Sequence, residues 1–450
     1  MAKVNQELQA IPNEFQDRNS EVVGVDLEKF GGFGFIETVV DGMANMNPER
    51  KARKQIFLTD SSKKEEREDL LKNIKLWLEL LESEESTEAL IERCKKKSNQ
   101  AVISLKNNLK QALNQCRPLE VNYRTIAQFY KNTELDKVDN VHIINASMEQ
   151  VTDLDNPVFM NYIAEEFKLY YDRLDLRDNY SLLSIPGYMG SNRVVDKWAR
   201  ICNENKVMLL TDFANLDKPD DVVDLFHSAN LTSADIHKSN VIMTCNWLVG
   251  RGRAEEVGEE EDVFIAPSTS LTGKIHKTLM SQVAAGKKHG GINEVDAVKF
   301  ELKKSEISQL EKMGLVPMVN EYGKIMAFSA KTLFDGDNIG LQTYSVVRVF
   351  DYVTKVLLDF LNRRAFENWS AKNEDDLRKQ IVVFLDGIKG ADKLIEKFKI
   401  VRFEQDKHQK DRVWLDIRLT PYFPAKSFVI KLDGHKGDDG NDWEAEYVQE

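Results

Sequence analysis

Two segments of the chain have residue types that could bind phosphate. Ser268 to Ile275 (STSLTGKI) is similar to a phosphate-binding loop, in which backbone N–H groups and a lysine surround the phosphates. That motif requires glycine where Ser268 stands and a hydroxyl residue where Ile275 stands. Because the first change prevents the loop from wrapping the phosphates and the second removes a magnesium ligand, we expect an ordinary helix start here.

The second segment is the turn Gly187 to Ser191 (GYMGS), between an expected strand and an expected helix. Backbone N–H groups at the start of a helix can hold an anion. The turn lacks the G-x-G-x-x-G spacing of a dinucleotide site. The pattern therefore favours a structural strand-to-helix turn, and an α/β enzyme that binds an anionic ligand at Gly187–Ser191 is the alternative.

Metal-binding and nucleophile patterns are incomplete throughout the chain. Asp335 to Asn338 begins like a calcium loop, but Val346 stands where a bidentate Glu is required. The seven histidines form no HxxxH pair, the four cysteines form no CxxC pair, and no Ser lies in a G-x-S-x-G turn. The acidic segment 438–450 has no ligand periodicity. We therefore predict no catalytic residue, no cofactor and no metal, and a protein that is not an enzyme.

Composition indicates a folded, acidic protein. The chain has 450 residues, 42% of them hydrophobic, and 62 Lys and Arg against 74 Asp and Glu, which gives a net charge of −12. A chain with this much apolar material can form sizeable cores, and its length suggests roughly two to four domains. An acidic balance argues against nucleic acid as the main partner. No run of 18 apolar residues is present, so we expect a cytoplasmic protein without membrane insertion.

The middle of the chain alternates strands with helices, which predicts a parallel sheet in a mixed α/β fold. The expected strands are Leu182–Ile185, Val207–Thr211 and Val241–Cys245, and the expected helices are Ser191–Glu204 and Asp220–Ala229. The charged, glycine-containing segment 250–262 is expected to be an exposed loop.

Two amphipathic helices are expected before this region. The first begins near Ser62, and its apolar residues are Leu70, Ile74, Trp77, Leu78 and Leu81. The second has apolar residues from Val102 to Cys116 and is expected to stop before Pro118. Their apolar faces need a partner surface, either within the chain or on another chain.

The last third combines helices with alternating segments. A β-hairpin is expected from Val316–Val319 and Lys324–Phe328, followed by helices through 346–361 and 377–388. The pattern divides the chain into five parts: an N-terminal arm (1–60), a helical segment (61–135), an α/β middle domain (136–300), a C-terminal domain with terminal strands (301–434) and an acidic tail (435–450).

The terminal strands are the candidate site for contacts between subunits. Alternation predicts strands at Phe398–Phe403, Val413–Leu419 and Phe428–Leu432. The final strand can pair within its own chain or be donated to a neighbour, and the pattern alone favours a hairpin within the chain. The candidate contact residues are Val413, Leu415, Ile417, Leu419, Phe428, Val429, Ile430 and Leu432.

The C-terminal third resembles contractile tail sheath proteins. The resemblance rests on Gly314–Pro317, Lys324–Ser329 and Lys331–Leu333, in that order, and is good over residues 300–433. The long helix around Arg348 and the ending Leu419–Tyr422 are similar to TssC/VipB, the large sheath subunit of type VI secretion systems. The segment Ala266–Lys274 resembles a phage-sheath loop, and Asn122–Ile126 resembles the divergent form found in Bacteroidetes.

This resemblance implies a structural function. TssC-like proteins pair with a small TssB subunit and stack as six-fold rings around a tube of Hcp protein, and their terminal strands interlace between neighbours in a C-terminal strand-exchange sheet. Contraction drives the tube outward, and the implied partners also include a baseplate and a ClpV-type ATPase. A phage-like sheath built from a single component is the alternative within this class. The chain departs from the family at Arg364–Trp369, where an R-x-A-H-Y segment is usual, and residues 1–20 contain no clear ATPase-recognition helix.

Overall fold

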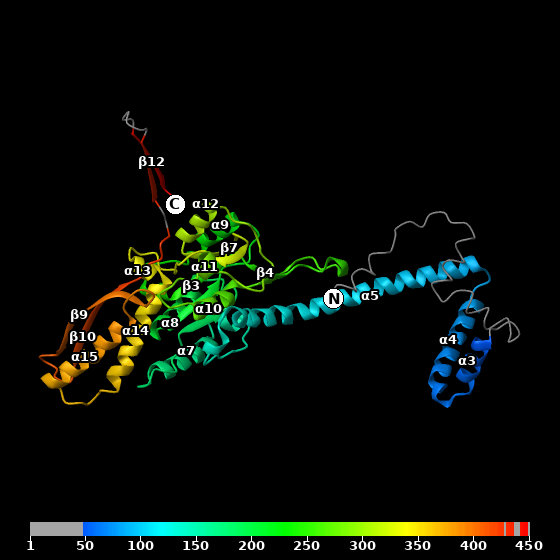
Figure 1. The fold of residues 1–450 in the computed structure, drawn as a ribbon, viewed down its shortest axis with the longest axis horizontal. Helices are drawn as coiled ribbons and strands as arrows, with labels where there is room; N and C mark the ends of the chain where they lie inside the picture. The colour runs from blue at the N-terminus through cyan, green and yellow to red at the C-terminus, as the bar shows by residue number, and fades with distance from the viewer. Residues whose placement is uncertain (1–47, 427–428, 436–441, 449–450) are drawn as a thin grey trace. The chain divides into compact units, whose positions relative to one another are not determined.

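A computed structural model describes residues 48–426, 429–435 and 442–448 of the chain (Figure 1). These residues belong to two compact units, which meet in sequence between Ser104 and Leu105. Within the described residues, none of the helices combines the length and the apolar character that crossing a membrane requires.

The first unit is helical. Its elements are α3 (Pro48–Thr59), α4 (Lys64–Glu82) and the beginning of α5 (Thr87–Asn132). The Asp60 carboxylate accepts a hydrogen bond from the Ser62 N–H and so caps the turn between α3 and α4. The Arg67 guanidinium donates to the carbonyl oxygens of Phe57 and Asp60, at 2.6 Å each. The helix predicted from Ser62 is therefore confirmed as α4, whereas α3 lies in a segment for which no element was expected.

Helix α5 runs through Pro118, so the prediction that it stops there is wrong. Proline lacks an N–H and cannot bond the carbonyl of Asn114, which favours a helix end. The residues after Pro118 compensate because they pack against other elements of the second unit, to which they belong. Gly273 of α10 approaches them so closely that an added Cβ would lie 2.6 Å from the Phe129 carbonyl oxygen. Tertiary packing thus outweighs the missing hydrogen bond.

The centre of the second unit is a five-stranded sheet with strand order β1-β2-β3-β7-β8. Neighbouring strands are parallel from β1 to β7, and β8 is antiparallel to β7. The strands are β1 (Leu182–Ile185), β2 (Met208–Asp212), β3 (Val241–Cys245), β7 (Leu315–Glu321) and β8 (Lys324–Ala327). This confirms the predicted parallel sheet and hairpin. The expected boundary at residue 300 falls inside this sheet, because β7 pairs with β3.

Helices cover both faces of the sheet (Figure 1). On one face, Leu209 and Met243 pack in a core with Trp198 of α8, and on the other face Leu210 and Ile242 pack with α10 and α14. Alternate residues of one strand face opposite cores, as the pleat requires. The helices and the smaller sheet β5-β4-β6 complete this region: α6 (Met148–Thr152), α7 (Val158–Tyr171), α8 (Asn192–Glu204), α9 (Pro219–Ala229), α10 (Pro267–Lys277), α11 (Gly286–His289), α12 (Lys304–Lys312), α13 (Ile339–Gln342), β4 (Leu248–Arg251), β5 (Val263–Ile265) and β6 (Ala297–Val298).

A third core lies toward the C-terminus. Helices α14 (Tyr344–Asn362) and α15 (Ala371–Ile388) pack against an antiparallel pair of strands, β9 (Ile395–Gln405) and β10 (Val413–Pro421). The last two strands, β11 (Val429–His435) and β12 (Asp442–Val448), form a separate antiparallel pair.

Candidate functional site

The turn at Gly187 already holds an anion, which is a carboxylate of the chain itself. The Gly187 N–H donates to Asp212 Oδ2 at 2.8 Å, and the Ser268 N–H, near the start of α10, donates to Asp212 Oδ1 at 2.7 Å. The Ser268 and Thr244 hydroxyls donate to the same carboxylate. Burial raises the pKa of Asp212 to about 6, against the effect of these donors. The donors that could have held a phosphate therefore bind Asp212, and the turn has a structural role.

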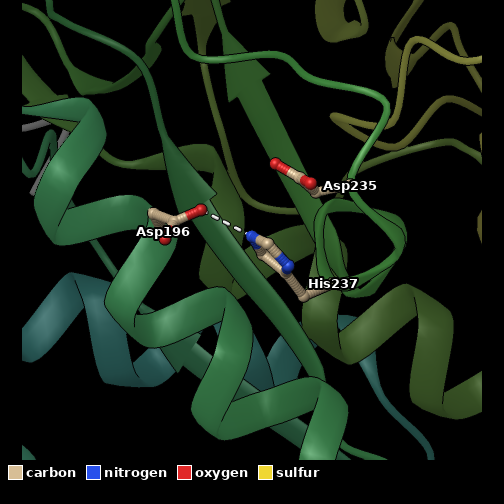
Figure 2. Close-up of side chains that lie close together, drawn as sticks. All are labelled: Asp196, Asp235 and His237. Carbon is tan, nitrogen blue, oxygen red and sulfur yellow. Dashed lines mark hydrogen bonds and ion pairs between the residues drawn. The ribbon is translucent and has the colours of Figure 1, made fainter.

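A cluster of potential metal ligands joins α8 to the short 3-10 helix Ile236–Asn240, which precedes β3 (Figure 2). One ligand atom from each of Asp196, Asp235 and His237 lies within 4.8 Å of the others. His237 Nε2 lies 2.5 Å from Asp196 Oδ1, and Arg200 Nε donates to Asp196 Oδ2 at 2.8 Å. The Lys238 ammonium lies 3.9 Å from the same carboxylate.

This arrangement suits an internal ion-pair network better than a metal site. A divalent cation would have to displace the guanidinium of Arg200 and would be repelled by Lys238. Burial raises the pKa of Asp196, but the hydrogen bonds from Arg200 and His237 outweigh burial and leave that pKa below its usual value. The sequence pattern does not reveal this trio, because Asp196 lies on a different element from the other two residues.

Three of the four predicted contact residues of β10 face their own chain. Leu415, Ile417 and Leu419 are half-buried and pack with the core of α14 and α15, whereas Val413 is exposed. Strand β10 pairs with β9, with Ile417 opposite Ile400. These side chains are thus used within the chain, and a neighbouring chain would meet the backbone edges of this two-stranded sheet.

The predicted contact residues of the last strand lie on a hairpin. Val429, Ile430 and Leu432 belong to β11, which pairs with β12 rather than with β10, and Phe428 lies outside the described residues. The segment expected to be an acidic tail therefore contains a strand. Its charges alternate with apolar residues in Asp442–Val448 (DWEAEYV), and this two-residue period is typical of a strand.

Helix α4 presents an apolar face that the described part of the chain leaves uncovered. Leu71, Ile74, Leu78 and Leu81 recur at helical spacing on one side and are 52%, 37%, 51% and 53% exposed. None of the residues of α4 is buried. Apolar stripes of this kind mark protein–protein contacts in soluble proteins. The sequence predicts that the apolar faces of the N-terminal helices need a partner surface. For this face of α4, no described residue of the chain forms that surface.

Ion pairs attach the charged segment 250–262 to α5. The guanidinium of Arg251 donates twice to the Glu120 carboxylate, at 2.8 Å each, and once to Glu259 Oε2 at 2.7 Å. The hydrogen bond from Arg251 lowers the pKa of Glu259 to about 2 and also holds the pKa of Glu120 below its usual value. Part of the expected exposed loop is therefore held in place by α5.

This network should make the stability of the chain depend on pH. Carboxyl groups whose pKa is depressed by folding stabilise the protein above their unfolded pKa, near 4.5, and lose that contribution as the pH falls toward 2. We expect Arg251→Met to lower the free energy of unfolding by about 2–3 kcal/mol at pH 7, with a smaller difference below pH 4. Urea unfolding at several pH values measures it. Arg253→Met is the matched control, because Arg253 pairs with the exposed Glu255 and its loss should change stability little. A difference that stays constant down to pH 3 would contradict this account.

Comparison with known proteins identifies related families over most of the chain. Residues 111–335 match the family "Type VI secretion system TssC/VipB, central domain". Residues 343–449 match the TssC/VipB-like C-terminal domain, and residues 21–109 match the TssC/VipB-like N-terminal region. No curated protein sequence matches the chain.

Several solved structures are similar to this chain. The contracted helical sheath of the anti-feeding prophage is 15% identical to this chain. The match covers 70% of this chain and 82% of the prophage chain, with a TM-score of 0.48. A chain of the baseplate of the same prophage is 14% identical. That match covers 67% of this chain and 84% of the baseplate chain, with a TM-score of 0.47. A sheath tail protein from Desulfitobacterium hafniense is 9% identical. The match covers 65% of this chain and 60% of the tail protein, with a TM-score of 0.40.

Proposed function

Because the chain belongs to the TssC/VipB family of type VI secretion systems, we propose that it is the large subunit of a contractile sheath. It co-assembles with a small TssB-like subunit into a helical tube, which surrounds an inner tube of Hcp-like protein and contracts to propel it. A baseplate anchors one end of the sheath, and a ClpV-type ATPase dismantles it after contraction. The assembly lies in the bacterial cytoplasm.

The observation that carries this proposal, beside family membership, is the uncovered apolar face of α4. Leu71, Ile74, Leu78 and Leu81 form an apolar stripe that the described residues leave exposed, and such a stripe costs free energy unless another surface covers it. A small sheath subunit is the natural occupant, because a two-component sheath needs a large, permanent contact between its two proteins.

The terminal strands supply a second type of contact. Strands β9 and β10 form a two-stranded sheet in which a neighbour's strand can add to an outer edge, and β11–β12 is a hairpin separate from it. Strand addition gives main-chain hydrogen bonds between subunits. Such links keep subunits attached while their bodies rotate during contraction. A lattice with two stable states can then release stored free energy without dissociating.

Electron microscopy of the chain tests the proposal directly. The chain is purified alone and together with the small protein encoded beside it, and both samples are imaged in negative stain. Hollow, striated cylinders that appear only with the small protein are the expected result. Cylinders formed by this chain alone would instead support a single-component, phage-like sheath. Separate particles in both samples would refute the proposal.

A further inference from the structure

A cavity of about 330 Å³ lies between α14 and the segment that precedes β1. Apolar side chains form part of its wall, among them Met208, Met280 and Val356. Charged residues also line it: Arg177, Lys206, Arg348, Asp351, Lys355 and Asp359. Four cations and two carboxylates therefore face one small space. Its volume is at the lower end of the range for small-ligand sites.

Most of these charges have partners outside the cavity or across it. Arg177 pairs with Asp175, and Asp359 pairs with Arg363 and accepts the Leu176 N–H. Asp351 accepts a hydrogen bond from Asn240 at 2.9 Å and lies 3.9 Å from the Lys206 ammonium. Arg177 and Lys206 are thus balanced by carboxylates, and the Asp351 carboxylate also favours the charged form of Lys355.

Arg348 has no carboxylate partner among the described residues. Its one hydrogen bond there is a long one, 3.4 Å from a guanidinium nitrogen to the Ile275 carbonyl oxygen, although a guanidinium has five N–H donors. Burial lowers its pKa to about 10. Burial, together with the nearby charge of Arg348, lowers the pKa of the His276 imidazole, so this ring is neutral at pH 7 and supplies no charge that balances Arg348. A partly buried guanidinium without a counter-charge is costly to the fold.

Lys355 adds a second positive charge on the same side of α14. It follows Arg348 by seven residues, which places both on one face about 10 Å apart along the axis. Its ammonium donates to the Tyr180 carbonyl oxygen at 2.6 Å, and burial lowers its pKa to about 8. Asn179 also lines the cavity, and its side-chain oxygen has no hydrogen-bond partner.

We propose that this cavity binds an oxyanion, a carboxylate or phosphate group, between Arg348 and Lys355. The planar guanidinium matches the two oxygens of such a group, and the lysine supplies a second charge. A ligand that also carries a hydroxyl would satisfy the Asn179 oxygen. The oxyanion is either a free small molecule or an acidic side chain of a neighbouring chain, and only the second source depends on the proposed sheath function.

The first experiment measures thermal unfolding of the full chain with citrate or inorganic phosphate, against sodium chloride of equal ionic strength. We expect either anion to raise the midpoint by about 3 °C or more at saturating concentration. Arg348→Met should abolish this shift, and Arg348→Lys should retain part of it. Arg378→Met is the matched control, because Arg378 pairs with Glu374 and does not line the cavity.

The unliganded variants provide a signature that a purely structural arginine would not give. Because Arg348 is an unbalanced charge, Arg348→Met should raise the midpoint without ligand by about 2 °C, whereas a structural arginine would lower it. A lowered midpoint together with unchanged anion binding overturns the proposal.

The second experiment identifies the source of the oxyanion. If neither small anion shifts the wild-type chain, cylinder formation with the small subunit should be lost in Arg348→Met and retained in Arg378→Met, which assigns the ligand to a neighbouring chain. Normal cylinders from Arg348→Met in that case overturn the proposal. If the wild-type chain forms no cylinders, the proposed sheath function fails, and the thermal experiment alone decides on the cavity.

Discussion

Proline at position 429 or 430 is expected to prevent the growth of long sheath cylinders at protein concentrations that are just sufficient for the wild type, while the body of the chain stays folded. Both residues lie on β11, where Val429 is opposite Val448 and Ile430 is opposite Tyr447. Adjacent residues of an antiparallel strand direct their N–H groups to opposite edges. One substitution therefore removes a donor from the ladder with β12, and the other removes a donor from the outer edge, where a neighbour's strand can pair.

The outer-edge substitution should have the larger effect on assembly. Losing one main-chain hydrogen bond to a neighbouring chain costs about 1–1.5 kcal/mol for each contact between strands of two subunits. This loss raises the protein concentration needed for assembly roughly tenfold. Negative-stain microscopy over a concentration series measures this shift. The free energy of unfolding of the chain should change little, because β11–β12 is a sheet separate from the other sheets of the described residues.

Threonine supplies the matched control at both positions. Val429→Thr and Ile430→Thr keep the N–H and the branched shape that a strand favours, so they should assemble like the wild type. Normal cylinders from both proline variants would refute strand exchange through β11. Loss of cylinders in the threonine variants as well would indicate that side-chain packing, rather than main-chain pairing, makes the contact.

The regular parts of the fold follow from local patterns. The sheet strands at Leu182–Ile185 and Val241–Cys245 have the predicted limits, because buried parallel strands consist of short, continuous apolar runs. The long helix α14 follows from its 3.6-residue period. Where local signals conflict with long-range packing, prediction fails. Helix α5 passes through Pro118 because residues that follow in the sequence pack onto α10, and no local pattern contains that information.

The site was harder to predict because its features depend on residues far apart in the sequence. Asp212, Gly187 and Ser268 come from three separate segments of the chain and meet only in the fold. In the sequence alone, the turn at Gly187 therefore resembles a free anion-binding site, although the Asp212 carboxylate occupies its donors. On β10, alternation identifies the apolar side correctly but not what covers it, and α14 and α15 of the same chain are its partner. In contrast, the strand in 442–448 has a local signal, the alternation of charged and apolar residues, which the high charge of the segment obscures.

Aspartate at Leu71 and Leu78 together is expected to abolish co-assembly with the small subunit while the chain remains folded. Both side chains are about half exposed, at 52% and 51%, so their replacement removes little apolar surface from the cores of this chain. In an interface with another chain, two buried carboxylates without partners would cost several kcal/mol, enough to weaken binding by at least about a hundredfold.

Leu76→Asp is the matched control, because Leu76 is more exposed, at 62%, and lies on the opposite side of α4. Co-purification of the tagged small subunit with each variant measures binding, and circular dichroism compares helix content. We expect the double variant to lose the small subunit and Leu76→Asp to retain it. If both bind normally, the α4 face is not the contact with the small subunit. Loss of binding in both would mean that the whole surface of α4 is enclosed, as expected for a helix surrounded by several chains of the sheath.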